Sequence, residues 1–385
     1  MTNPACTHLA RPTAPPGWLT GAGHFLALGV LMGAWATSLP GLKRRFDYTD
    51  QELSLVLLAL AAGAAVAFLS CARLMRAVGP QLTLRTTAVL AAHALLATQL
   101  VSSTVALVIS AFLLGWASAA FDVAINARAV ALERDLGRSV MSKLHAMFST
   151  GGVLAALAAG ALFSHGSQHP LWLAVPAALA LVLSSLPAAA GASAPEPPAA
   201  PAAAPQRSRL LWRLGAAALL CLLCEGVMYD WSAVYMVQAF DASMALSVAG
   251  FGLFSAAMAF GRFTGDSLRD RHGVGRLLLA GCGLAAVGAV MAAHGGQREL
   301  ALAGFVLVGL GLSNVIPIVF ALAPRGCPSS PEHAIAFVSG IGFVGFLVGP
   351  PLVGLWSALF SLDTSLWLVA VASLGVAALA GRSRP

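Results

Sequence analysis

Ionisable side chains are rare inside the apolar stretches of this sequence, and each of them could carry chemistry. A charge within a lipid bilayer is costly, so such a residue often marks a path for protons or solutes. Three histidines, His24, His93 and His294, have no partner at helical spacing, which favours structural roles for them. The remaining candidates are Asp122, His145, Glu225 and Asp230.

Asp122 is the first candidate because Asn126 follows four residues later. Residues four apart project from the same face of a helix. Removal from water favours the neutral form of a carboxyl group, so Asp122, inside an apolar stretch, could carry a proton and also contact a solute. The alternative is a structural carboxylate that pairs with Arg128 or makes a polar contact between helices.

His145 and Ser149 are also four residues apart, near the start of an apolar stretch. An imidazole titrates near neutral pH and could relay a proton to or from Asp122. We therefore predict proton coupling for His145 and solute binding for Ser149. The alternative for His145 is a residue at a helix start that bonds to the backbone or to Asp266.

Glu225 and Asp230 lie in one further apolar stretch and are separated by five residues. On a straight helix this spacing places them about 140° apart. Both could face one cavity only if Gly226 breaks the helix, as in discontinuous transporter helices. We predict proton coupling for Glu225 and an outer-gate or solute-binding role for Asp230, the alternative being pairing with polar groups of neighbouring helices.

Two tryptophans and two small polar residues complete the predicted solute site. Trp35 and Trp231 offer aromatic faces that suit sugar rings, although tryptophan also anchors helices at membrane interfaces. Ser38 follows Trp35 by less than one turn. Asn314 would provide an amide beside a kink at Pro317.

Twelve apolar stretches must position these residues. Hydrophobic residues make up 58% of the 385 residues and charged residues only 10%, whereas a soluble domain carries roughly 25% charged residues. A bilayer-spanning helix needs about 20 apolar residues. The predicted spans are Trp18–Pro40, Leu53–Arg73, Leu82–Val101, Thr104–Val130, Met141–Phe163, Pro170–Ala190, Leu210–Val237, Met244–Gly265, Gly275–His294, Leu300–Pro324, Ala334–Phe360 and Ser365–Ala380.

The segment 191–209, GASAPEPPAAPAAAPQRSR, divides these spans six and six. Its Ala/Pro content is typical of a semi-extended tether. We predict a disordered tail (1–17), a first six-helix bundle (18–190), this linker (191–209) and a second six-helix bundle (210–385). The bundles share weak similarity at an offset near 192 residues, for example Ala65–Phe68 with Ala257–Phe260, which is typical of transporter halves. The predicted fold is all-α and integral to the membrane.

The distribution of basic residues predicts the orientation. With both termini in the cytoplasm, only Lys43, Arg44, Arg45 and Arg298 of the 22 Lys/Arg residues fall outside, as the positive-inside rule requires. We expect a bacterial inner-membrane protein, monomeric, whose net charge of +7 contacts lipid rather than nucleic acid. The sequence contains no enzyme motif, and we expect neither a cofactor nor a metal. Cys221 and Cys224 form a CxxC pattern within an apolar helix, which favours packing.

One loop motif is more specific. The segment 261–273, GRFTGDSLRDRHG, has glycines that allow helix ends to approach, acids that can cap a facing helix, and arginines that can bind an acid or lipid phosphate. The corresponding first-half loop lacks the acid, so the latch would rest mainly on Asp266, which should meet the start of the fifth span near Lys143 and His145. The alternative is a basic cytoplasmic loop that only makes the turn between two spans. The predicted cytoplasmic gate comprises Gly261, Arg262, Gly265, Asp266, Asp270, Arg271 and Gly273.

With this motif, the chain resembles the major facilitator superfamily from about Trp18 to Ala380. The Asp122/Asn126 pair is similar to that of the fucose–proton symporter family, in which a fourth-span Glu and an Asn four residues on serve sugar and proton binding. This chain has no acid beside Trp35, where that family carries one. The segment 122–152 also resembles a group of uncharacterised bacterial facilitators.

The leading interpretation is secondary active transport of a small polar solute, sugar-like or an organic acid, by alternating access and proton symport. No phosphate-binding loop for ATP is present. The alternatives are a proton-driven exporter of drugs or metabolites and a sensor that binds a solute without moving it.

Overall fold

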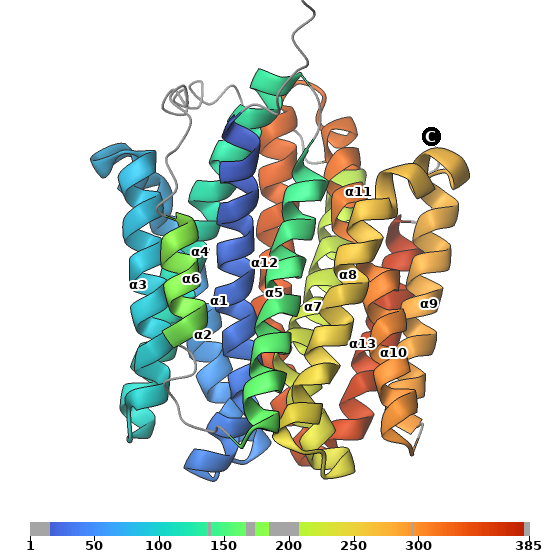
Figure 1. Ribbon diagram of the computed structural model, residues 1–385. Coiled ribbons are helices and arrows are strands. Elements are labelled where there is room, and N and C mark those ends of the chain that lie inside the picture. The colour runs from blue at the N-terminus through green and yellow to red at the C-terminus, as the bar shows by residue number, and fades with distance from the viewer. Residues whose placement is uncertain (1–15, 138–139, 167–173, 185–207, 295, 381–385) are drawn as a thin grey trace, which may run out of the picture.

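The chain folds into long, closely aligned helices (Figure 1). The computed structural model describes residues 16–137, 140–166, 174–184, 208–294 and 296–380, so most of the predicted tail and linker lie outside the described residues. The described elements are α1 (Pro16–Phe46), α2 (Asp50–Val78), α3 (Pro80–Leu100), α4 (Thr104–Leu136), α5 (Met141–Ser164), α6 (Ala174–Ser184), α7 (Arg209–Phe240), α8 (Met244–His272), α9 (Val274–His294), α10 (Arg298–Leu312), α11 (Val315–Leu322), the 3-10 turn η2 (Ala323–Gly326), α12 (Pro331–Leu359) and α13 (Leu362–Ala380).

Within the described residues, ten helical segments are long and apolar enough to cross a membrane. The run from α10 to η2 counts as one of them, whereas α3 and α6 are not among the ten. These ten segments indicate a multi-pass helical protein, and the number of twelve spans stays a prediction.

The helices pack as two groups. Helices α1 to α6 pack mainly among themselves, and α7 to α13 do the same; we call these groups the N-half and the C-half. The halves meet along a seam where α5 packs on α8, α2 on α12 and α1 on α7. In Figure 1, α5 and α8 lie in the middle of the molecule, between α3 on one flank and α9 on the other.

The two halves repeat one another with an offset of 194 residues. Helix α2 runs from 50 to 78 and α8 from 244 to 272, so both ends differ by 194. Both helices end at a glycine with positive φ, +84° at Gly79 and +76° at Gly273, a conformation in which glycine has no Cβ penalty. The sequence similarity near 192 residues had indicated the repeat, and the helix ends place it two residues further.

Close helix packing repeats as well. A Cβ atom on Gly115 of α4 would lie 1.9 Å from the Leu60 carbonyl oxygen of α2, and one on Gly309 of α10 would lie 2.5 Å from that of Phe254 of α8. Both pairs of positions differ by 194. Small residues let helices approach closely in lipid, where water supplies no force to press them together.

Two helices test the predicted breaks. The predicted kink near Pro317 is present as an interruption at Ser313 and Asn314, between α10 and α11. Proline has no N–H for the carbonyl four residues back, here Ser313, which explains the position of the break. Helix α7, in contrast, continues through Gly226 without interruption, so the condition for Glu225 and Asp230 to face one cavity is not met.

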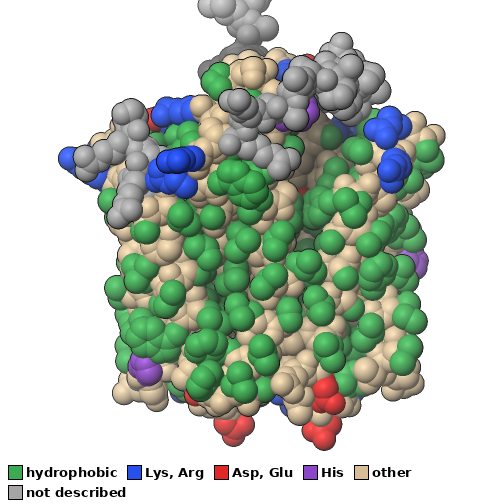
Figure 2. Space-filling view, turned by 180° about the vertical axis from the view of Figure 1, so that it is seen from behind, with side chains coloured by type: hydrophobic (Ala, Val, Ile, Leu, Met, Phe, Trp, Pro, Cys, Tyr) green, Lys and Arg blue, Asp and Glu red, His purple; other side chains and the backbone are tan. Residues whose placement is uncertain are grey.

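The surface separates by charge. Apolar side chains cover the flank in Figure 2, Lys and Arg gather at one end, and acidic side chains show at the other. We call the first the basic end. Basic residues at the opposite end have partners: Lys43 pairs with Asp50 at 3.1 Å, and the Arg45 guanidinium donates to the carbonyls of Val101 at 2.8 Å and Thr98 at 3.2 Å, which end α3.

Candidate functional site

A buried ion pair lies in the C-half. Arg262 Nη2 of α8 is 3.2 Å from Glu225 Oε2 of α7, and the two residues are only 8% and 5% exposed. The Cys221 thiol, one turn earlier on α7, donates to Glu225 Oε1 at 3.6 Å. Two charges removed from water need one another, so this pair is a functional candidate of the kind that rarely occurs in a membrane span.

The same arginine joins the two halves. Arg262 Nη1 donates a hydrogen bond of 2.9 Å to Ser149 Oγ of α5, which is fully buried. The third guanidinium nitrogen, Nε, is buried without a hydrogen-bond partner among the described residues. Glu225, Arg262 and Ser149, which we call the seam cluster, therefore link a buried ion pair on one half to a hydroxyl on the other.

The repeat gives this cluster an apolar counterpart. With the offset of 194, Arg262 corresponds to Phe68 and Ser149 to Phe343. These two phenylalanines also meet across the seam, with ring centroids 3.9 Å apart. Glu225 corresponds to Leu31, a fully buried core residue. The two halves thus contact one another at two equivalent positions, through Arg262 and Ser149 at one and through Phe68 and Phe343 at the other. Since the aromatic contact serves at one position, the fold does not require the polar contact at the other.

Asp122 and Asn126 share a face of α4, as their spacing predicts. Asn126 Nδ2 donates to Asp122 Oδ1 at 2.9 Å and to the Asp122 carbonyl at 2.9 Å. Arg128, the partner considered in the alternative interpretation, instead donates to Gln81 of α3. Asp122 is accordingly a carboxyl group with an amide partner, and no basic side chain among the described residues pairs with it.

His145 lies one turn before Ser149 on α5, and its ring meets the Phe25 ring of α1 edge-on at 5.1 Å. The described contacts do not connect it to Asp122 or to Asp266. The imidazole is therefore placed on the same helix as the Ser149 end of the seam cluster, while a direct relay to Asp122 stays a prediction.

Asp230 is partly exposed and, among the described residues, has neither an ion pair nor a hydrogen bond. Tyr229 beside it meets the ring of Phe148 of α5 at 6.1 Å and that of Phe251 of α8 at 5.0 Å. The offset of 194 makes Tyr229 the counterpart of Trp35. The structure thus places Glu225 on the seam and leaves Asp230 outside the seam cluster.

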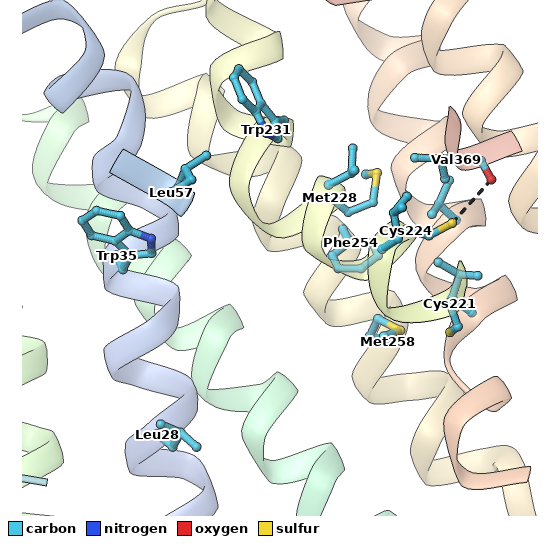
Figure 3. Packing of buried hydrophobic residues seen from close by; sticks show 14 of the residues in the cluster. Leu28, Trp35, Leu57, Cys221, Cys224, Met228, Trp231, Phe254, Met258 and Val369 are labelled. Atoms are coloured by element: carbon cyan, nitrogen blue, oxygen red, sulfur yellow. Dashed lines mark hydrogen bonds between the residues drawn. The ribbon is translucent and has the colours of Figure 1, made fainter. Parts of the chain in front are cut away.

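Trp35 and Trp231 belong to the hydrophobic core, with 0% and 1% exposed (Figure 3). Their indole N–H groups are buried without hydrogen-bond partners in the described part of the chain. Ser38 is buried too, and its hydroxyl donates to the Trp35 carbonyl at 2.7 Å. In this conformation none of the three is open to a solute. Figure 3 also shows the Cys224 thiol donating to the Val369 carbonyl, the packing role expected for the CxxC pattern.

Asn314 packs against the segment 261–273, which was predicted as a loop but forms the last turns of α8 and its C-cap, Gly273. Its Nδ2 donates to the Gly261 carbonyl at 3.1 Å and to Ser313 Oγ at 3.0 Å. A Cβ on Gly265 would lie 1.7 Å from Asn314 Oδ1. Gly261 and Gly265 therefore serve a close crossing of α8 with the break between α10 and α11, and Asn314 fills that crossing.

The predicted latch has other partners in this structure. Asp266 Oδ1 is 3.4 Å from Arg269 Nη2, and Arg269 Nε is 3.8 Å from Asp270 Oδ1, all on α8. Arg271 and Gly273 end the same helix. The predicted target of Asp266, the start of α5, is capped by a different acid. Glu133 Oε1 of α4 accepts hydrogen bonds from the N–H groups of Val140 at 2.6 Å and Met141 at 2.8 Å.

Sequence reasoning placed Arg262 in the cytoplasmic gate and missed its pairing with Glu225. The available signal was depth: Arg262 precedes Asp266 by four residues, or about 6 Å along the helix, and apolar residues surround it in sequence. The N–H groups that Glu133 caps, by contrast, depend on a turn that no spacing rule predicts.

Comparisons with known proteins agree with the helical architecture. The sequence profile described as Major Facilitator Superfamily matches residues 18–332. An uncharacterised MFS-type transporter of Yersinia pestis is 32% identical over 359 residues, covering 92% of this chain and 93% of the relative.

Two solved structures show the same fold. The inward-facing, unoccupied bacterial homologue of the human lysosomal transporter Spinster superposes with a TM-score of 0.74 at 14% identity, covering 96% of this chain and 97% of the other. The fucose:proton symporter of E. coli superposes with a TM-score of 0.67 at 16% identity, covering 97% and 100%. Because the profile matches residues 18–332 and the Yersinia pestis relative is 32% identical over 92% of this chain, the chain belongs to the major facilitator superfamily of transporters.

Proposed function

We propose that this protein is a proton-coupled symporter of a small polar organic solute, sugar-like or an organic acid, built as twelve spans in two six-helix bundles. The observation that carries the proposal is the seam cluster, where the Glu225–Arg262 ion pair reaches Ser149 of the other half. Alternating access requires the halves to move against one another. A titratable group at their contact can tie that movement to a proton.

The coupling follows from the charge balance of the cluster. When Glu225 is ionised, Arg262 has a counter-ion and is held beside Ser149. When Glu225 takes a proton, the attraction is lost and a buried cation is left without its partner, which is strongly unfavourable. The arginine must then find another acceptor, such as a solute oxygen, or the seam must rearrange.

Asp122 is the second proton site in this proposal. Its only described side-chain partner is the Asn126 amide, so either protonation state can be accommodated by the same contact. The amide and carboxyl groups together can bind a hydroxyl of the solute. His145, Ser149, Asp230 and Asn314 remain proposed contributors, and the unpaired indole N–H groups of Trp35 and Trp231 would become donors if the seam opens.

The basic end is the cytoplasmic end in this proposal, because the positive-inside rule places Lys and Arg there. Both termini then lie in the cytoplasm of a bacterial inner membrane. The neighbours include proteins described as a fucose:proton symporter and a nucleoside transporter, which are compatible with a hydroxyl-bearing solute. Export of drugs or metabolites is the alternative.

The test uses proteoliposomes and the solute that most stabilises the purified protein in a thermal screen. An inward proton gradient should drive uptake, and Asp122→Asn should reduce that uptake at least about tenfold while solute exchange without a gradient continues, because a neutral amide cannot carry the proton. The matched control is Asp135→Asn, an exposed carboxylate on the same helix, which should leave uptake unchanged.

Three results would contradict the symporter. Outward movement of solute against proton entry would establish the exporter, and binding without flux would establish a sensor. Equal gradient-driven uptake by Asp122→Asn and the parent would exclude Asp122 as the coupling site.

A further inference from the structure

One carboxylate joins the two halves at the end opposite the basic end. Asp50 is the first residue of α2. Its Oδ1 is 3.1 Å from Lys43 Nζ of α1 and accepts a hydrogen bond of 3.0 Å from Gln238 Nε2 of α7. Its Oδ2 accepts a hydrogen bond from Ser357 Oγ of α12. Two of the three partners therefore belong to the C-half, and Lys43 belongs to the N-half.

Backbone packing beside this carboxylate is equally tight. A Cβ on Gly354 of α12 would lie 2.0 Å from Ser54 Oγ of α2 and 3.1 Å from the Asp50 carbonyl oxygen. Ser54 is only 3% exposed. A cavity of about 210 Å³ adjoins the cluster and is lined by Asp50, Tyr235, Gln238, Ala239, Leu362 and Asp363. Helices α2 and α12 thus pack closely against one another, and the cavity lies immediately beside this contact.

Some helices do not contribute to the seam. Helix α4 packs within the N-half, and α10 and α11 pack within the C-half; among the described residues these three make no substantial contact across the seam. The repeat does not reproduce the Asp50 cluster, because the residue 194 positions after Asp50 is Met244. This closure is therefore a particular feature of one end of one seam contact.

We propose that Asp50 is the latch of the outer gate. It holds the outer end shut by accepting hydrogen bonds from Gln238 and Ser357 across the seam, and Lys43 positions its carboxylate and balances its charge. Opening toward the outside requires both cross-seam bonds to break. The proposal rests on the proposed transport function, because a gate has meaning only for a molecule that alternates between two openings.

The test measures access to a buried cysteine and needs neither solute nor proton gradient. Ser54→Cys places a thiol in the closed contact, and its reaction rate with a maleimide is measured in purified protein after subtraction of the same protein without this substitution. Adding Asp50→Asn should raise the rate about tenfold, the change expected when one hydrogen bond to a charged group is lost.

Two further variants keep the test sharp. Glu52→Gln changes a carboxylate two residues along that caps α2 through Thr49 and makes no hydrogen bond to the C-half among the described residues, so it should leave the rate unchanged. Gln238→Leu with Ser357→Ala keeps Asp50 and Lys43 intact and should raise the rate as Asp50→Asn does, which covers the case in which Asp50→Asn does not fold.

Unchanged labelling in the Gln238/Ser357 double variant would overturn the latch, as would an equal increase in Glu52→Gln. Either result would leave proton-coupled uptake by the parent protein untouched. Conversely, absent uptake with the predicted labelling would count against the proposed function and not against the closed contact itself.

Discussion

At the residue scale, the Glu225–Arg262 ion pair is not needed for the halves to pack, since the equivalent contact is made by the apolar side chains of Phe68 and Phe343. Replacing a buried ion pair by apolar residues is often neutral for stability, whereas removing one partner costs about 3–5 kcal/mol. We therefore expect Glu225→Leu with Arg262→Met to unfold at the denaturant concentration of the parent. Transport by this double variant should be lost, as measured by gradient-driven uptake in proteoliposomes.

The two single variants are the controls for this prediction. Glu225→Leu leaves Arg262 buried without its counter-ion, and Arg262→Met leaves the carboxylate without its base, so each should lower the free energy of unfolding by about 3–5 kcal/mol. Uptake by the double variant at the parental rate would show that the pair contributes only to folding.

At the element scale, glycine sets how closely α2 and α12 approach. We expect Gly354→Ala to destabilise the purified protein by about 1–3 kcal/mol, the usual cost of overpacking, because the added Cβ would lie 2.0 Å from Ser54 Oγ and 2.6 Å from Ser54 Cβ. A second substitution, Ser54→Gly, removes both atoms and should recover most of the loss. The measurement is the midpoint of thermal unfolding.

The repeat supplies a matched control. Gly160 of α5 is the counterpart of Gly354 at the other seam contact, and a Cβ there would meet its nearest atom, Val248 Cγ2, at 3.5 Å, an ordinary contact. Gly160→Ala should therefore leave the midpoint nearly unchanged. A loss in Gly160→Ala as large as that in Gly354→Ala would mean that general helix propensity, and not the close approach, determines the effect.

Helices and their periodic partners could be predicted from sequence, and contacts between distant helices could not. Asp122 and Asn126 are found by helical spacing, and their hydrogen bond is local. The Arg262–Ser149 contact joins residues 113 positions apart, and the Asp50–Ser357 contact joins residues 307 apart. No periodicity encodes either one, because each depends on how two complete helices cross.

At the scale of the whole molecule, the halves are related in form and unequal in chemistry. The offset of 194 carries helix ends, glycines and seam crossings from one half to the other. The three residues of the seam cluster correspond to Leu31, Phe68 and Phe343 under this offset, and Asp50 corresponds to Met244, so neither carboxylate has an acidic counterpart. The two seam contacts are related by the repeat, but the Arg262–Ser149 bond lies only at α5/α8 and the Asp50–Ser357 bond only at α2/α12.

If the halves move as units, a covalent bridge across the seam should stop transport, whereas a bridge within one half should not. The cross-seam pair is Ser54→Cys with Ser357→Cys, since Ser54 and Asp50 are one turn apart on α2 and Ser357 bonds Asp50. The within-half pair is Gln238→Cys with Ser357→Cys, two C-half positions that both bond Asp50. The two pairs share one cysteine and are read with the same short bifunctional thiol reagent.

We expect uptake by the cross-seam pair to fall at least about tenfold on bridging and to recover when a cleavable bridge is reduced, because a closed outer end cannot admit solute. Uptake by the within-half pair should remain within about twofold of the unbridged protein, since α7 and α12 stay together as the C-half moves. Bridging would be verified by the mass of the peptide pair. Continued transport with the cross-seam bridge complete would mean that the outer end does not open at α2 and α12, and loss of transport in both pairs would mean that the C-half itself deforms during the cycle.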